Sequence, residues 1–205
     1  MMADTKKILF LTNSDFGQAN AVLAVAHALL VHHAPKVEIH IASFRGIRDA
    51  VAKTSNFALQ SAPAGTAPII FHELDGLTWG AAAWRPEVGF AEANDQPPGF
   101  LNSAKSILLI PAVMLPWRPD EFLLIYRQLE RVISTVNPDL TVGDALFSPA
   151  TTLCHYLSTN WVVLAPNTIK DFALPSQPWL AMMWKYPLYV RPLALTQYAL
   201  LTSTN

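Results

Sequence analysis

Two polar segments of this chain directly follow short apolar runs. The loop 13–18 comes after the run Lys6–Thr12, and Asp144 closes the run Asp139–Asp144. Each run has the length of a buried parallel strand. Because ligands in open α/β sheets gather outside the carboxyl ends of the strands, we expect Asp144 and the loop residue Gln18 to meet at a ligand site. A carboxylate at that edge can take a proton from a ligand, whereas the amide of Gln18 cannot.

Two further residues are candidates for the same site. Gly17 suits a tight strand-to-helix turn that brings backbone close to a ligand. His72 follows the apolar run that begins at Pro68 and is expected to face the ligand pocket, although a lone histidine usually satisfies local hydrogen bonds. Structural alternatives also exist: Asp144 can cap the helix after its strand, and Gln18 can cap backbone groups at a helix start.

The segment 73–100 has no clear periodicity but is rich in aromatic residues. Trp79, Trp84, Phe90 and Phe100 are spread among its glycines and prolines. Long loops of this kind in compact domains are often binding loops, so we predict that Trp79 and Trp84 contact a ligand. The alternative is a loop that packs on its own core.

The elements that must position these residues alternate between strand and helix. The apolar segment 19–31 predicts a helix buried on most sides, and the alternation in 37–41 predicts a strand parallel to the first. Further strands are predicted at 68–72, 139–144 and 161–165, and further helices at 45–55, 103–113, 119–136 and 149–157. This order predicts the α/β class, with a Rossmann-like parallel sheet flanked by helices.

Charge and motifs argue against several classes of function. The net charge of -1 offers no field of one sign that could gather nucleic acid. The glycine patterns of dinucleotide-binding, P-loop and serine-hydrolase enzymes are absent from the sequence. The histidines show no paired spacing with carboxylates and Cys154 is the single cysteine, so we predict neither a metal site nor an internal disulfide.

The chain is unusually apolar. Hydrophobic residues make up 52% of it and charged residues only 14%, against about 25% charged residues in a typical soluble domain. The surplus suggests a face covered by a further domain, a partner or a membrane interface. The segment 179–201 is the candidate for membrane contact, but its two basic residues and two prolines argue against a spanning helix. With no recognisable signal peptide, we expect a cytoplasmic protein with at most peripheral membrane contact.

The order of these elements resembles the N-terminal, acceptor-binding domain of family 1 UDP-glycosyltransferases, in a fungal-like form. The stretches 8–20 (Ile-Leu-Phe-Leu-Thr-Asn-Ser-Asp-Phe-Gly-Gln-Ala-Asn) and 137–150 (Asn-Pro-Asp-Leu-Thr-Val-Gly-Asp-Ala-Leu-Phe-Ser-Pro-Ala) carry this resemblance. It implies one half of a GT-B architecture with a pocket for the acceptor. Six aromatic residues suggest that the acceptor is a lipophilic small molecule: Trp79, Trp84, Phe90, Phe100, Trp179 and Trp184. The resemblance also places Phe16 and Phe147 among the substrate-binding residues, together with Gly17, His72, Trp79 and Trp84.

The resemblance further implies how an inverting sugar transfer is catalysed. In the family, a histidine of the first stretch takes the proton of the acceptor hydroxyl, and an aspartate of the second stretch orients the histidine ring. Asp144 matches the aspartate, whereas Gln18 replaces the histidine and cannot act as a base. Three alternatives follow: Asp144 acts on the hydroxyl itself, another histidine such as His72 substitutes, or the chain does not catalyse.

Nothing after Asn167 resembles the motif with which the family's C-terminal domain holds uridine diphosphate. We therefore expect an acceptor-binding domain at 1–170 and an aromatic, proline-rich segment at 171–205 that leads toward a missing domain. The chain itself is expected to hold no cofactor, and a UDP-sugar donor is expected only with a C-terminal domain. The predicted function is the acceptor half of a UDP-sugar-dependent glycosyltransferase. The alternatives are a non-catalytic module that needs a separate donor-binding chain and a truncated inactive fragment.

Overall fold

A computed structural model describes residues 5–95, 102, 108–109 and 111–166 of the 205-residue chain. The chain divides into two compact units. The first, Met1–Trp79 with Trp117–Ala165, contains the sheet, and the second comprises Gly80–Pro116 and Pro166–Asn205. The predicted segment 171–205 lies outside the described residues.

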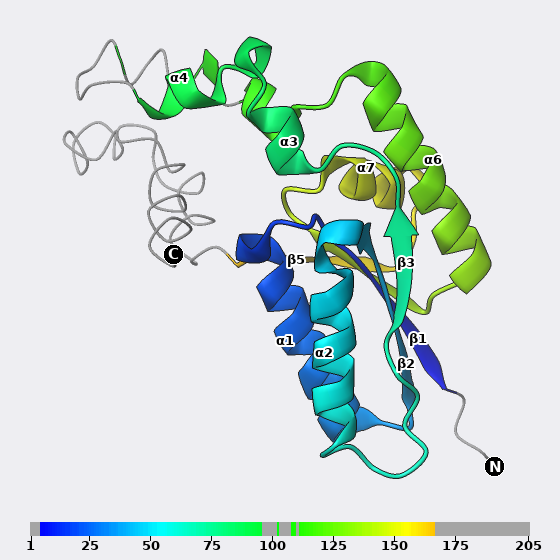
Figure 1. Ribbon diagram of the computed structural model, residues 1–205. Helices are drawn as coiled ribbons and strands as arrows, with labels where there is room; N and C mark the ends of the chain where they lie inside the picture. Colours follow the sequence, from blue (N-terminus) through cyan, green and yellow to red (C-terminus); the bar gives the residue numbers. More distant parts are fainter. Residues whose placement is uncertain (1–4, 96–101, 103–107, 110, 167–205) are drawn as a thin grey trace, which may run out of the picture. The chain divides into compact units, whose positions relative to one another are not determined.

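The first unit is built on a five-stranded parallel sheet with the strand order β3-β2-β1-β4-β5 (Figure 1). The strands are β1 (Lys6–Leu11), β2 (Val37–Phe44), β3 (Ile70–Leu74), β4 (Leu140–Asp144) and β5 (Trp161–Leu164). Every neighbouring pair is parallel, as crossover connections through helices require. The predicted α/β class and Rossmann-like parallel sheet are confirmed.

Helices cover both faces of the sheet (Figure 1). One face carries α1 (Phe16–His33) and α2 (Arg48–Leu59), which follows the short 3-10 turn η1 (Arg45–Ile47). The other face carries α6 (Pro119–Val136) and α7 (Ser148–Tyr156). The bounds of α6 are those predicted from its apolar stripe.

The core between the sheet and α1 explains why that helix is rich in alanine. The buried side chains of β1, β2 and β4 that point to this face include Phe10, Ile39, Ile41 and Val142. They meet Ala19, Val22, Ala26 and Leu30 of α1, all at most 1% exposed. Small residues on α1 let the helix backbone approach the sheet closely. Because strand side chains alternate, the strand residues next to these core residues point to the α6 face.

Three predicted boundaries need correction. Helix α1 begins at Phe16 rather than residue 19, so Gly17 and Gln18 are helical. Strand β2 continues to Phe44. Strand β3 runs from Ile70 to Leu74 rather than 68–72, because it pairs with the longer β2, and His72 therefore lies inside it.

The aromatic segment 73–100 is not a plain loop in its described part. It contains the short helices α3 (Trp79–Ala83) and α4 (Phe90–Asn94) and the 3-10 turn η2 (Pro86–Val88). Gly89, with φ 74°, joins η2 to α4 in a left-handed conformation that favours glycine. Of the predicted helix 103–113, residues 103–107 and 110 are outside the described residues.

Among the helices that the structure describes, none combines the length and apolar character that a bilayer crossing requires. The segment 179–201, singled out in the sequence for membrane contact, is not among the described residues.

A pair of leucines on α6 tests how this helix is held. Leu129 is fully buried, whereas Leu123 on the same helix is 47% exposed. Leu129→Ala is expected to lower the free energy of unfolding by about 2–5 kcal/mol, through lost burial and a cavity. Leu123→Ala is expected to change it by less than about 0.5 kcal/mol. Urea denaturation of both variants measures the difference, and equal losses would contradict the described packing of α6.

Candidate active site at the carboxyl edge of the sheet

The carboxylate of Asp144 joins the loops that follow β1 and β4. Its Oδ2 accepts hydrogen bonds from Thr12 Oγ1 at 3.1 Å and from the backbone N of Asn13 at 3.3 Å, with Asn13 Nδ2 at 3.5 Å. Its Oδ1 accepts one from the backbone N of Leu146 at 2.9 Å. Asp144 is 1% exposed, so nearly all of its hydrogen bonding is provided by the protein.

Burial raises the pKa of the Asp144 carboxyl above its ordinary value of 3.8. The hydrogen bonds from Leu146, Asn13 and Thr12 oppose this shift, since they favour the charged form, but burial outweighs them. A carboxylate with a raised pKa is a stronger base than an ordinary surface aspartate.

Gln18 lies in the first turn of α1 and is 8% exposed. Its backbone N donates to Asp15 O at 2.9 Å, but its side-chain Oε1 is buried without a hydrogen-bond partner among the described residues. A buried carbonyl oxygen without a partner costs free energy that a ligand donor can recover. The helix-cap alternative for Gln18 therefore does not account for its side chain.

Other unpaired polar atoms occur in the segments that follow the strands. Within the described part of the chain, Asn13 Oδ1, Ser43 Oγ and Ser148 Oγ are also buried without partners. Residues two positions apart on a strand share a face of the sheet. Ile41 and Val142 point toward α1, so Ser43 and Asp144, each two positions further along, lie on the same face. Asn13 and Ser43 were not among the predicted residues, although both stand at the end of an apolar strand pattern, where ligands of parallel sheets gather.

The two residues before Gln18 are both exposed. Phe16 is the first residue of α1 and is 51% exposed, and Gly17 follows it within the helix. Gly17 does not adopt the left-handed conformation found at Gly65, Gly76 and Gly89. The predicted tight turn at Gly17 is therefore wrong, because Gly17 lies within α1. As a glycine, it leaves this position of the helix surface without a side chain.

Phe147 is enclosed by its own chain. It is 0% exposed and makes edge contacts with Phe44 at 5.9 Å and Trp117 at 6.1 Å between ring centroids. The Trp117 indole is itself fixed by a hydrogen bond from Nε1 to Leu77 O at 2.8 Å. Phe147 therefore packs inside the unit against Phe44 and Trp117, and it presents no surface to a ligand in this structure.

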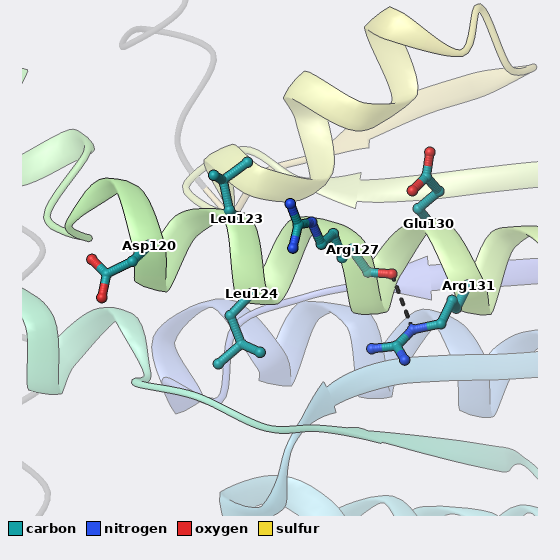
Figure 2. Close-up of a pocket in the computed structure, with 6 residues that line it drawn as sticks. All are labelled: Asp120, Leu123, Leu124, Arg127, Glu130 and Arg131. Atoms are coloured by element: carbon teal, nitrogen blue, oxygen red, sulfur yellow. Dashed lines mark hydrogen bonds between the residues drawn. The ribbon is translucent and has the colours of Figure 1, made fainter.

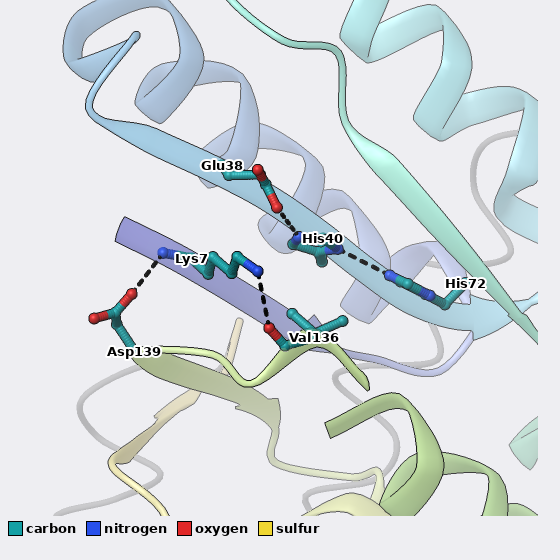
Figure 3. A network of polar contacts seen from close by, with 6 residues as sticks. All are labelled: Lys7, Glu38, His40, His72, Val136 and Asp139. Carbon is teal, nitrogen blue, oxygen red and sulfur yellow. Dashed lines mark hydrogen bonds and ion pairs between the residues drawn. The ribbon is translucent and has the colours of Figure 1, made fainter. Parts of the chain in front are cut away.

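His72 is engaged with β2 rather than with the Asp144 site. Its Nε2 lies 2.9 Å from Nδ1 of His40, whose Nε2 lies 2.7 Å from Glu38 Oε1 (Figure 3). In β2, Ile39 and Ile41 point toward α1, so His40 and its partner His72 belong to the α6 face. Asp144 belongs to the α1 face, which argues against His72 as the base at that site.

The two predicted tryptophans stand in or next to the second unit. Trp84 is 51% exposed and makes an edge contact with Phe90 at 4.9 Å between ring centroids. Trp79 is half-buried at the start of α3. Their contact with a ligand stays a prediction.

A hollow of the surface lies away from this edge. It measures about 750 Å³ and lies along the outer side of α6, lined by Asp120, Leu123, Leu124, Arg127, Glu130 and Arg131 (Figure 2). All of these residues come from one helix, so the hollow has no opposing wall within the described residues. In the part of the chain that the structure describes, no three histidine, cysteine, aspartate or glutamate side chains converge as metal ligands.

The five-stranded parallel sheet with helices on both faces is the fold of one half of a GT-B glycosyltransferase. It is similar to the Streptomyces sp. SF2575 glycosyltransferase SsfS6, with a TM-score of 0.52 and 12% identity, over 78% of this chain and 39% of that one. The glycosyltransferase of kitacinnamycin has a TM-score of 0.49 at 14% identity, over 85% of this chain and 35% of that one.

In sequence, the chain is similar to glycosyltransferase sdnJ of Sordaria araneosa. The two are 27% identical over 194 residues, which is 92% of this chain and 37% of sdnJ. The chain thus spans little more than a third of the length of this relative. No protein-family model matches the chain. The resemblance to glycosyltransferases predicted from the two strand-end stretches is confirmed.

Two threonines test the Asp144 hydrogen bonds. Thr12 and Thr141 are both 0% exposed, but only Thr12 donates to Asp144, and Thr141 Oγ1 has no partner among the described residues. Thr12→Val is expected to lower the free energy of unfolding by about 1.5–3 kcal/mol, since it removes a hydrogen bond to a charged group. Thr141→Val is expected to be neutral or stabilising. Chemical denaturation measures both, and equal effects would argue against the Thr12 contact.

The raised pKa of Asp144 predicts a pH dependence with a definite sign. Between 3.8 and the higher pKa of the folded state, the folded protein binds more protons than the unfolded chain, so stability falls as the pH rises through this window. Asp144→Asn removes this contribution. We expect the stability of wild type relative to Asp144→Asn to decline with rising pH in denaturation series, and a constant difference would show that Asp144 is not buried as described.

Proposed function

We propose that this chain is the acceptor-binding, N-terminal half of a UDP-sugar-dependent glycosyltransferase that acts on a hydroxyl of a lipophilic small molecule. The observation that carries the proposal is the buried, unpaired Gln18 Oε1 in the first turn of α1, at the sheet edge where Asp144 is held. The similarity to sdnJ supports the reaction class.

In this proposal, Gln18 binds and orients the acceptor. Its Oε1 is a hydrogen-bond acceptor without a partner in the described residues, so it can receive the O–H of an acceptor hydroxyl. This contact aligns the hydroxyl oxygen for attack, which is a contribution of position rather than of proton transfer. The ring of Phe16, the first residue of α1, is 51% exposed and is proposed to offer an apolar surface to the acceptor.

Asp144 is the proposed proton acceptor. Among the described residues, its Oδ1 receives the Leu146 hydrogen bond alone, so it has a lone pair left, and burial makes the carboxylate more basic. As the hydroxyl oxygen forms its bond to the anomeric carbon, the bond from that carbon to the diphosphate breaks. UDP leaves with the bonding electron pair, and the hydroxyl proton passes to Asp144, directly or through a water.

The donor is assigned to another domain. The described residues contain no glycine-rich loop that would cradle a diphosphate, and the chain covers 37% of sdnJ. A UDP-sugar is therefore proposed to bind only when a donor-binding domain is present. Trp84, which is half exposed, is proposed to contribute apolar contact to the acceptor.

A second candidate is a binding module without catalysis. The observation that favours it is that Gln18, which has no titratable group, stands where the resemblance places a histidine. In this case the edge still binds a hydroxylated ligand, but no sugar is transferred when a donor-binding domain is supplied.

The test compares two glutamine variants in the presence of a donor-binding domain, supplied in a longer gene product or as a separate chain. Gln18→Ala is expected to lower kcat/KM for the acceptor about 10–100-fold, as loss of a buried hydrogen bond does. The control is Gln60→Ala, an exposed position at the end of α2 that should leave kcat/KM unchanged. Sugar transfer is followed by mass spectrometry of the acceptor.

Three results would separate the candidates. Transfer that falls in Gln18→Ala and is retained in Gln60→Ala supports the proposed enzyme. Acceptor binding without transfer, with the donor-binding domain shown to bind UDP, supports the binding module. Transfer that is unaffected by Gln18→Ala would show that the acceptor hydroxyl is held elsewhere.

A further inference from the structure

A second polar system lies on the α6 face of the sheet, separate from Asp144. It is a line of three side chains from two strands: Glu38 and His40 of β2 and His72 of β3 (Figure 3). His40 is at the centre and is 5% exposed. Both of its ring nitrogens are engaged, with Glu38 Oε1 at 2.7 Å and with His72 Nε2 at 2.9 Å.

This geometry fits only one hydrogen between the two imidazole rings. With Glu38 ionised, His40 Nε2 carries a hydrogen and donates to the carboxylate. The contact from His40 Nδ1 to His72 Nε2 then needs a hydrogen on one nitrogen and a lone pair on the other. If both rings become protonated, two N–H groups and two positive charges face each other at this contact, and the hydrogen bond is lost.

The strand that His72 belongs to depends on this contact more than an inner strand would. β3 ends the strand order and pairs only with β2 among the described strands. Beyond the backbone ladder, its neighbourhood is held by Ser55 Oγ, which accepts from Ile69 N at 3.0 Å, and by Gln128 Oε1, which accepts from Asp75 N at 2.8 Å. Within the strand itself, the described side-chain links are the His40–His72 pair on the α6 face and the ion pair between Glu73 and Arg48 on the other face.

Two charged side chains of the flanking strands have partners of their own. On β1, Lys7 lies opposite Glu38 in register, and its Nζ donates to Val136 O at 3.3 Å. On the opposite face of β3, Glu73 forms an ion pair with Arg48.

Helix α6 covers the face on which the pair lies, but it brings no titratable group among its buried residues. Those residues are Ile125, Gln128, Leu129, Ile133 and Val136. Its charged residues Asp120, Arg127, Glu130 and Arg131 line the hollow on the outer side of the helix, and Glu121 accepts a hydrogen bond from Arg118 N at the helix start.

We propose that the Glu38–His40–His72 line is a proton-operated lock that holds the edge strand β3 on the sheet at neutral pH and loosens it when a second proton enters the pair. The lock is independent of the proposed glycosyl transfer, since it lies on the other face of the sheet.

The direction follows from the proton balance. Burial, and then the charge of His40, hold the pKa of His72 below its ordinary value of 6.5. The unfolded or opened strand therefore binds more protons than the closed strand below 6.5, so closure is complete above this value and weakens as the pH falls through the lower pKa of the folded state.

The test is hydrogen exchange of the 205-residue chain. After correction for intrinsic exchange, the protection of β3 amides relative to β1 amides is expected to fall about tenfold or more between roughly pH 7.5 and pH 5, the range over which imidazoles titrate. His72→Gln, which does not titrate, is expected to remove this pH dependence. His33→Gln, at the exposed end of α1, is the matched control and should retain it.

Two results would overturn the lock. One is a ratio of β3 to β1 protection in the wild type that is the same at both pH values. The other is a fall in His72→Gln as large as in the wild type. Because the wild-type ratio decides by itself, the proposal stays testable if the variant does not fold.

Discussion

The buried carboxylate of Asp144 is the constraint on which the carboxyl edge of this sheet depends. A carboxylate that is 1% exposed must be paired inside the protein, because its desolvation is costly. Its partners come from the loop after β1 and from the turn after β4, which are more than a hundred residues apart in the chain. One side chain thereby sets the relative position of two loops and of the start of α1.

The sheet also separates two polar systems that have different tasks. Alternation of side chains along a strand places Asp144 and Ser43 on the α1 face and His40 and His72 on the α6 face. Hydrophobic residues of the strands lie between them, so the two systems do not exchange hydrogen bonds. A change of protonation in the histidine pair therefore acts on the edge strand β3, whereas Asp144 acts on the loops that surround the proposed acceptor.

In the proposed site, the amide of Gln18 stands where the resemblance implies a histidine, so the proposed chemistry differs although the fold is the same. An amide can receive the hydrogen bond of a hydroxyl but cannot keep its proton, so the proton must find another base. Asp144, a strand-end carboxylate with a raised pKa, is available for this role in the proposed site. The proposed site therefore separates two roles: Gln18 accepts the hydrogen bond of the hydroxyl, and Asp144 takes its proton.

The parallel α/β fold, the limits of α6 and the strand-end position of Asp144 could all be predicted from residue patterns along the chain. These rest on local periodicity and on apolar runs that are buried whatever their partners. Tertiary structure decided the rest. Pairing with β2 set the ends of β3 and drew His72 into the strand, and Phe44 and Trp117, distant in sequence, enclosed Phe147. Such outcomes depend on which segments become neighbours, and no local pattern of residues contains that information.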